Sequence, residues 1–195
     1  MLHCIVGTMK SSKSSHLIDY TEVIKPKKFI IFYPSCCEKK PDYVISRDND
    51  KQAKAIKIFE IQDMYQHIQN IDVIFIDEFQ FLTGSNNIDD FMEFIEFCDK
   101  NKKEVYLFGL ALDYKANAFD ITSRVLPYAD TIMVLHANCD ICGAENKATR
   151  CIRYKNGELD LDLDAEILAM ESDTMEYKSV CTECFRNLTQ NPAIK

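Results

Sequence analysis

Residues 71–82 read IDVIFIDEFQFL. Within them, residues 73–76 form an uninterrupted run of β-branched and aromatic residues, which is typical of a strand buried on both faces of a parallel sheet. The run ends in two acids, Asp77 and Glu78, and carboxylates are costly to bury without partners. Open α/β sheets bind ligands at the carboxyl ends of their strands. The stretch therefore predicts a Walker B element, in which one acid serves Mg²⁺ and the next acts on a nucleophile. The alternative is a buried strand that ends in two solvated acids.

A second motif lies near the N-terminus. Residues 1–6 are apolar and predict the first strand, which runs into GTMKSSKSS at residues 7–15. Three residues occupy required places of the P-loop pattern G-x-x-x-x-G-K-[ST]: Gly7, Lys13 and Ser14. Ser12 stands where the second Gly belongs. Such a loop wraps a phosphate in backbone N–H groups, while its Lys reaches the outer oxygens and its hydroxyl ligates Mg²⁺. The alternative is a Ser/Lys-rich turn before a helix, which is expected to start at residues 16–20.

Apolar runs and amphipathic segments alternate along the following chain. The apolar runs predict strands at residues 28–33, 43–46, 104–109 and 130–136. The amphipathic segments predict helices at residues 63–70, 88–103 and 121–129. Residues 53–59 fit either a strand or the start of a helix. Alternating strands and helices form parallel sheets. The expected fold is therefore α/β, with a P-loop, RecA-like, mostly parallel sheet and helices on both of its faces.

The composition excludes several classes of protein. A hydrophobic share of 47% and a charged share of 28% are ordinary for a soluble globular chain. No run is long enough to span a membrane, and the apolar N-terminal stretch is too short for a signal peptide, so we expect a cytoplasmic protein without a membrane partner. The net charge of −8 argues against a broad nucleic-acid surface, which needs a basic face. Nucleotides remain possible ligands, because they need only a local cationic pocket.

The nine cysteines indicate metal binding rather than disulfides in a chain without an export signal. Four of them form two C-x-x-C pairs: Cys139, Cys142, Cys181 and Cys184. Paired knuckles supply four thiolates to Zn²⁺, whereas a redox dithiol would not need the second pair. We therefore expect structural zinc. Asn156 and Gly157 predict a hairpin turn between the pairs, and the acidic residues 158–173 predict a mobile loop.

The change of character near residue 137 predicts two domains. Residues 1–136 are expected to form a P-loop nucleotide-binding domain, and residues 137–195 a small zinc-ribbon-like lobe. Cys36 and Cys37 are adjacent, which gives poor geometry for one shared metal, and we expect no special role for them.

Together these motifs resemble the small P-loop thymidine kinases that carry a zinc-bearing C-terminal lobe. Five segments carry the resemblance: GTMKSSKSSHLI from residue 7, DEFQFL at residues 77–82, FGLALDYKANAF at residues 108–119, YADTIMVLHANCDIC at residues 128–142 and YKSVCTECF at residues 177–185. Each segment is a weak signal alone. Their order and spacing, over nearly the whole chain, are specific.

The resemblance implies ATP-dependent phosphorylation of thymidine at its 5′-hydroxyl to give dTMP, a reaction of DNA-precursor salvage. It implies that Lys13 contacts the phosphates of Mg-ATP, that Ser14 ligates Mg²⁺ and that Asp77 holds the metal through its water shell. Glu78 is the implied base that accepts the proton of the 5′-hydroxyl. The implied ATP- and Mg-binding set is Gly7, Thr8, Met9, Lys10, Ser11, Ser12, Lys13, Ser14, Asp77 and Gln80.

The resemblance also implies a nucleoside site in the zinc-binding lobe and a homotetramer. Four aromatic residues match base-binding positions: Phe81, Tyr114, Phe119 and Tyr177. Ordinary core packing is the alternative for each of them. Residues 166–177 match the loop whose backbone groups read the base.

Several departures from the family pattern suggest a divergent enzyme. Besides Ser12, Cys37 and Lys39 align where the family usually has Asp and Arg, and Ser172 and Asp173 replace a Gly-Gly pair. Lys39 lacks the bidentate fork of Arg, and Cys37 cannot replace a carboxylate near Mg²⁺. One alternative is therefore a silent nucleotide-binding relative with a regulatory or assembly role, which the retained Glu78 opposes. A zinc-ribbon ATPase acting on nucleic acid is a further alternative, which the acidic excess after residue 137 disfavours.

Overall fold

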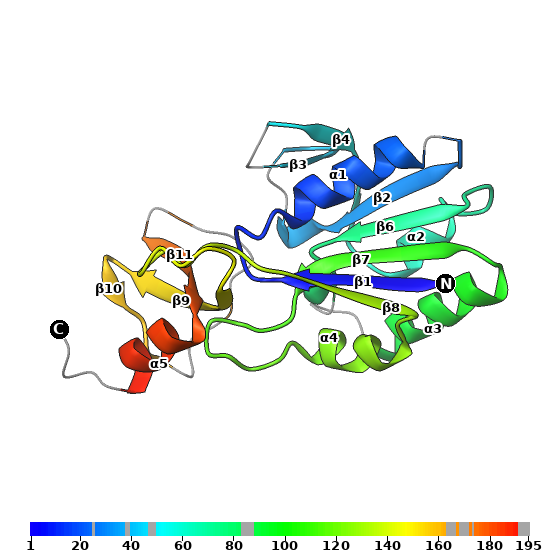
Figure 1. The fold of residues 1–195 in the computed structure, drawn as a ribbon. Coiled ribbons are helices and arrows are strands. Elements are labelled where there is room, and N and C mark those ends of the chain that lie inside the picture. The colour runs from blue at the N-terminus through cyan, green and yellow to red at the C-terminus, as the bar shows by residue number, and fades with distance from the viewer. Residues whose placement is uncertain are drawn as a thin grey trace.

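A parallel six-stranded sheet forms the centre of the protein. The computed structural model describes residues 1–24, 26–37, 40–46, 50–82, 88–162, 167, 172 and 174–190. The strand order is β5-β2-β6-β7-β1-β8, and every paired strand runs parallel to its neighbour (Figure 1). These strands are β1 (Leu2–Gly7), β2 (Phe29–Pro34), β5 (Ile56–Ile58), β6 (Val73–Asp77), β7 (Glu104–Leu110) and β8 (Thr131–Leu135). The predicted α/β class and parallel sheet are confirmed.

Helices cover both faces of this sheet. They are α1 (Lys13–Val23) on one face, and α3 (Ile88–Lys100) and α4 (Asp120–Val125) on the other. Side chains alternate between the two faces of a strand, and β6 shows both destinations. Val73 and Phe75 pack in a cluster with α1, whereas Ile74 and Ile76 pack in a cluster with α3 and α4. All five residues of β6 are buried, so the continuous apolar run is explained by burial on both sides.

Several local predictions differ from the structure. Helix α1 begins at Lys13, before the expected residues 16–20. Residues 53–59 contribute to two strands, β4 (Gln52–Lys54) and β5, and between them Ala55 donates its N–H to the carbonyl of Asp42. Strand β4 pairs with β3 (Tyr43–Ile45) in a separate antiparallel hairpin.

Helix α2 (Gln62–Tyr65) is shorter than the predicted helix at residues 63–70. The segment that follows α2 is held by the buried ammonium of Lys103. This ammonium donates to the carbonyl oxygens of Ile68 and Ile71, both at 2.7 Å, and so satisfies backbone groups outside a helix.

A second, antiparallel sheet lies beyond the carboxyl ends of the central strands (Figure 1). It contains β9 (Ala148–Lys155), β10 (Glu158–Leu159) and β11 (Met175–Cys181), and helix α5 (Thr182–Gln190) follows. We call the described residues from 137 to 190 the C-terminal lobe; the division into two domains stays a prediction. Asn156 and Gly157 form the predicted tight turn, with φ values of 53° and 81°.

The acidic segment that follows this turn differs in part from the prediction. Glu158 and Leu159 pair with β9 as strand β10, because the tight turn returns the chain directly along that strand. Residues 163–166, 168–171 and 173 lie outside the described residues, and so does most of the loop expected to read the base.

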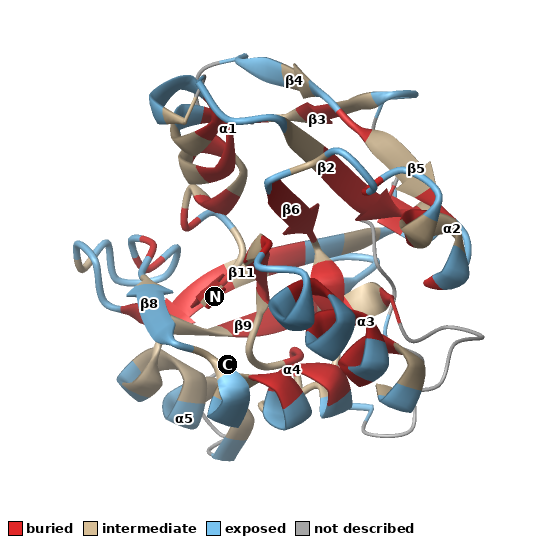
Figure 2. Ribbon diagram, turned by 90° about the vertical axis from the view of Figure 1, so that its right-hand side faces the viewer, coloured by how far each residue is buried: buried red, intermediate tan, exposed pale blue. Residues whose placement is uncertain are grey.

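Burial separates the centre of the sheet from its edge. Figure 2 shows β6 buried and β8 exposed at the end of the sheet. Three apolar residues of β8 are strongly exposed, Ile132 at 52%, Met133 at 41% and Val134 at 58%. Among the described residues, none of the helices has the length and apolar character required to cross a membrane.

Candidate functional site

The P-loop, residues 7–14, connects β1 to the N-terminus of α1. Lys13 is only 7% exposed, and its ammonium donates to the carbonyl oxygen of Thr8 at 2.6 Å. Lys10 and Ser12 both adopt left-handed backbone conformations, with φ values of 58° and 62°. Glycine adopts such a conformation without steric cost, whereas serine does not. The loop therefore keeps the backbone shape of a P-loop although Ser12 makes that shape less favourable. A helix N-terminus behind a loop of this kind attracts anions.

The acids of β6 meet the P-loop at one edge of the sheet. Asp77 is the last residue of β6 and is buried. The hydroxyl of Ser14 donates to Oδ2 of Asp77 at 3.4 Å, although β7 lies between β6 and β1 in the sheet. A hydroxyl and a carboxylate are hard oxygen donors, which suit Mg²⁺. The structure thus brings together two of the residues expected to serve the metal.

Glu78 is held in a defined position by Gln80. Glu78 has a φ of 51° and precedes the short 3-10 helix η2 (Phe79–Phe81). The amide nitrogen of Gln80 donates to Oε2 of Glu78 at 2.7 Å, and its amide oxygen accepts from the backbone N–H of Leu110 at 2.9 Å. Gly109 leaves room for this arrangement, because a Cβ there would lie 2.3 Å from the Gln80 oxygen. Gln80, expected among the ATP- and Mg-binding residues, is therefore bonded to Glu78.

The loop after β2 approaches the same acids. Cys36 and Cys37 lie in the 3-10 helix η1 (Ser35–Cys37), with their sulfurs 3.7 Å apart. The pKa of the Cys37 thiol is raised by its contact with Cys36, by burial and by the charges of Glu78 and Asp77. The contact with Cys37 lowers the pKa of the Cys36 thiol to about 7. Lys39, which aligns with the family Arg, lies outside the described residues.

The four expected base-binding aromatic residues form two ring pairs. Phe81 and Phe119 meet edge to face with ring centroids 5.5 Å apart. Tyr114, from the segment after β7, meets Tyr177 of β11 at 6.3 Å. Tyr114 and Tyr177 are buried, whereas Phe81 and Phe119 are half-buried. The second pair therefore joins the central sheet to the C-terminal lobe.

A buried arginine supports that second pair, and sequence reasoning missed it. Arg153 of β9 is 2% exposed, and its guanidinium lies 3.9 Å from the centroid of the Tyr114 ring. It donates to the Tyr114 hydroxyl at 2.7 Å and to the Asp160 carboxylate at 2.9 Å. It also hydrogen-bonds Tyr177. Burial opposes ionisation of Asp160, but the N–H of Asp162 and the charge of Arg153 outweigh it and lower the pKa. The only signal in the sequence was an Arg within a predicted hairpin. Its partners could not be identified from the sequence, because Tyr114 is distant along the chain and Asp160 lies beyond a turn.

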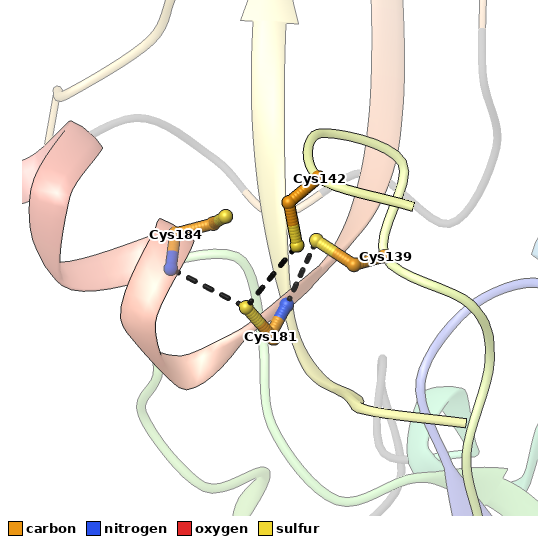
Figure 3. A group of neighbouring side chains, drawn as sticks. All are labelled: Cys139, Cys142, Cys181 and Cys184. Carbon is orange, nitrogen blue, oxygen red and sulfur yellow. Dashed lines mark hydrogen bonds between the residues drawn. The ribbon is translucent and has the colours of Figure 1, made fainter. Parts of the chain in front are cut away.

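The four cysteines of the two C-x-x-C pairs converge in the C-terminal lobe, as Figure 3 shows. Their sulfurs lie within 4.8 Å of one another. Burial opposes ionisation of Cys139, but backbone N–H groups of Cys142, Cys181 and Ile141 lower its pKa to about 6. Thiolates are the form that binds metal, and four of them fit tetrahedral Zn²⁺. The cluster is thus a candidate structural metal site whose donor set suits zinc.

Comparison with known proteins agrees with these features. Residues 1–186 match the family model described as thymidine kinase. The chain is 26% identical, over 190 residues, to a thymidine kinase of Pseudothermotoga lettingae, and the match covers 96% of this chain and 95% of that protein. The family match includes the P-loop, the acids at the end of β6 and all four clustered cysteines. The chain therefore belongs to the thymidine kinase family of enzymes.

Proposed function

We propose that this chain transfers the γ-phosphoryl group of Mg-ATP to the 5′-hydroxyl of thymidine or a related deoxynucleoside, a salvage reaction that yields dTMP and ADP. The contact between Ser14 and Asp77 at 3.4 Å carries this proposal. It joins the P-loop to the strand end where Glu78 follows Asp77, so groups for the phosphates, the metal and the nucleophile share one edge of the sheet.

The nucleotide half of the site consists of the P-loop and Asp77. Lys13 is buried at the start of α1, where the helix dipole also favours negative charge, and its ammonium contributes to phosphate binding. Ser14 and Asp77 would hold Mg²⁺, which neutralises charge on the transferring phosphoryl group when bound. Phosphoryl transfer depends mainly on positioning and charge neutralisation, so these few groups are sufficient for the nucleotide half.

Glu78 is the proposed general base. The 5′-hydroxyl is a poor nucleophile, and a carboxylate within hydrogen-bond reach both orients it and accepts its proton. Gln80 is a positioning residue, because it fixes one carboxylate oxygen of Glu78 to the backbone of β7. A carboxylate oriented in this way can accept the proton of a hydroxyl placed within hydrogen-bond reach.

The nucleoside half is proposed to involve the two aromatic pairs. Phe81 follows Gln80 directly and lies three residues after Glu78. A base bound beside Phe81 and Phe119 would therefore be near the proposed general base. Tyr114 and Tyr177 hydrogen-bond Arg153 and form the second pair of rings proposed to contact the nucleoside. Aromatic faces contribute stacking to bases without needing a specific polar side chain.

We propose a structural zinc ion in the four-cysteine cluster and a homotetramer as the assembled form. The exposed apolar residues of β8 support an oligomer, because an open strand edge of this kind invites pairing with another chain. All nine cysteines are free, which suits the proposed cytoplasmic location.

The direct test incubates the purified protein with Mg-ATP and a panel of deoxynucleosides and follows monophosphate formation. We expect dTMP from thymidine. Glu78→Gln keeps the size of the side chain but cannot accept the proton, so turnover should fall roughly 10²- to 10⁴-fold with little change in binding measured by calorimetry. Glu96→Gln, an exposed change on α3, is the control and should match the wild type.

Two outcomes of this test would contradict the proposal in different ways. Wild-type turnover in Glu78→Gln would remove Glu78 as the base. A protein that binds ADP and phosphorylates no nucleoside in the panel would instead be the silent nucleotide-binding relative.

A further inference from the structure

The tip of the P-loop contacts the C-terminal lobe beside the cysteine ligands. The ammonium of Lys10 donates to Oδ2 of Asp140 at 2.9 Å. Asp140 lies between Cys139 and Cys142 in the sequence. The hydroxyl of Ser179, on β11 and two residues before Cys181, donates to the carbonyl oxygen of Met9 at 2.5 Å. Two neighbouring residues of the loop are thus held by residues that neighbour both cysteine pairs.

These contacts form one connected unit, which we call the Asp140 cluster: Met9, Lys10, Asp140 and Ser179. The carboxylate oxygen of Asp140 that accepts from Lys10 also accepts from the backbone N–H of Ser179 at 2.8 Å. In return, the backbone N–H of Asp140 donates to the carbonyl of Ser179 at 2.8 Å. Ser179 is completely buried. The knuckle at residues 139–142 and strand β11 are therefore bonded to each other and support the P-loop as one unit.

The P-loop of this chain has a particular need for such support. Lys10 adopts a left-handed conformation without being glycine, which is unfavourable for an L-residue. Ser12 does the same two residues later. A loop with two such residues keeps its shape only when surrounding contacts stabilise it. Its N–H groups must keep that shape to surround a phosphate.

Metal binding would fix the Asp140 side of this unit. Cys139 and Cys142 belong to the candidate metal site, and a structural metal supplies folding free energy to the segment that carries its ligands. Loss of the metal would release the knuckle and, with it, the carboxylate that pairs with Lys10.

We propose that Asp140 is a positioning residue for the P-loop and that it couples metal occupancy to nucleotide affinity. The inference rests on the proposed function only in requiring that the P-loop bind phosphate groups. Because coupling between two binding sites is reciprocal, bound nucleotide must raise the affinity of the cysteine site for metal by the same factor.

The first measurement is ADP binding to Asp140→Asn by calorimetry, with zinc content determined on the same samples. Asn keeps the size of the side chain and loses the charge that pairs with Lys10. We expect about fivefold weaker ADP binding, at the lower end of ordinary coupling between sites, with zinc content and the KM for thymidine unchanged. Asp89→Asn is the matched control, because it breaks an exposed ion pair with Arg124 on α3 and α4. This control should bind ADP as the wild type does.

The second measurement titrates bound zinc with a selective chelator in the presence and absence of ADP, without magnesium. ADP should raise the zinc affinity of the wild type about fivefold, the same factor by which bound zinc raises its ADP affinity, and should have no effect on zinc in Asp140→Asn. Lys10→Met should lose the same coupling, and the double variant should lose no more than Asp140→Asn does.

The possible outcomes separate clearly. Wild-type ADP affinity in Asp140→Asn, or an ADP effect on zinc that survives in both variants, would overturn the inference. If Asp140→Asn loses zinc, the result for Lys10→Met decides the question, because Lys10 is remote in sequence from the cysteines. Loss of the coupling in Lys10→Met then supports the inference, and retained coupling in that variant overturns it. A wild type that shows the coupling but phosphorylates no nucleoside would refute the proposed function alone.

Discussion

Replacing Ser12 with glycine should stabilise the protein and retain or improve nucleotide affinity. Ser12 has φ 62° and ψ 23°, and its hydroxyl makes no capping hydrogen bond to α1. The left-handed conformation costs an L-residue about 1–2 kcal/mol, whereas glycine adopts it freely but loses about 0.5–1 kcal/mol more conformational entropy on folding. The middle values of the two ranges favour glycine by about 0.75 kcal/mol. For a chain of this size, 1 kcal/mol shifts Tm by roughly 2–4 °C, so Tm should rise by about 1.5–3 °C.

Thermal unfolding and ADP calorimetry test this prediction with two further variants. Ser12→Ala keeps the Cβ and should show no gain. Lys102→Gly changes an exposed residue with φ 56° after α3, and it measures what glycine contributes to this protein at a left-handed position away from the site. A Ser12→Gly protein with lower Tm, or with weakened ADP binding, would show that the Ser12 side chain makes a favourable contact and would refute the argument from backbone strain.

Three other perturbations have definite expected outcomes. Arg153→Met leaves Asp160 as a buried, unpaired charge, which should lower the free energy of unfolding by about 3–5 kcal/mol; Arg153→Lys keeps the charge but loses the planar fork, and should raise the KM for thymidine more than that for ATP. Cys181→Ser removes one thiolate, so elemental analysis should find bound zinc reduced from about one ion per chain to a small fraction, and full zinc content would rule out this ligand set. Cys36 has a lowered pKa of about 7, so its alkylation by iodoacetamide should be fast above pH 7 and should slow as pH falls through 7 and the thiolate is protonated; a midpoint near 9 in the wild type, with Cys36→Ser as the blank, would contradict that pKa.

Local sequence patterns were sufficient to predict the sheet and the motifs that it presents. The apolar run before Asp77 identified β6, because a strand buried on both faces leaves no alternation of polar residues. The spacing of Cys139 and Cys142 identified half of the candidate metal site, because a knuckle is formed within one turn of chain. The P-loop was found in the same way, despite Ser12.

The missed features depend on partners that are far apart along the chain. Arg153 bonds Tyr114, 39 residues away, and no periodicity marks a charged strand residue as buried. Lys10 bonds Asp140 across 130 residues, and the P-loop pattern leaves that position unspecified. The bond from Gln80 to the backbone of Leu110, 30 residues away, was likewise not predicted, and the expected place of Gln80 among the ATP- and Mg-binding residues stays a prediction. Such contacts are set by tertiary packing, which a single sequence encodes only indirectly.

The position of the second cysteine pair in the sequence has a consequence for biosynthesis. Chains are made from the N-terminus, and their earlier parts begin to fold first. All six strands of the central sheet precede Cys181 and Cys184, so the sheet and the P-loop are synthesised before the metal site is complete. Ribosome-bound chains can therefore assemble the phosphate-binding edge early, yet Ser179 and the last two thiolates arrive only at the end. The proposed zinc ion can therefore find its full set of four thiolates only after almost the whole chain has been made.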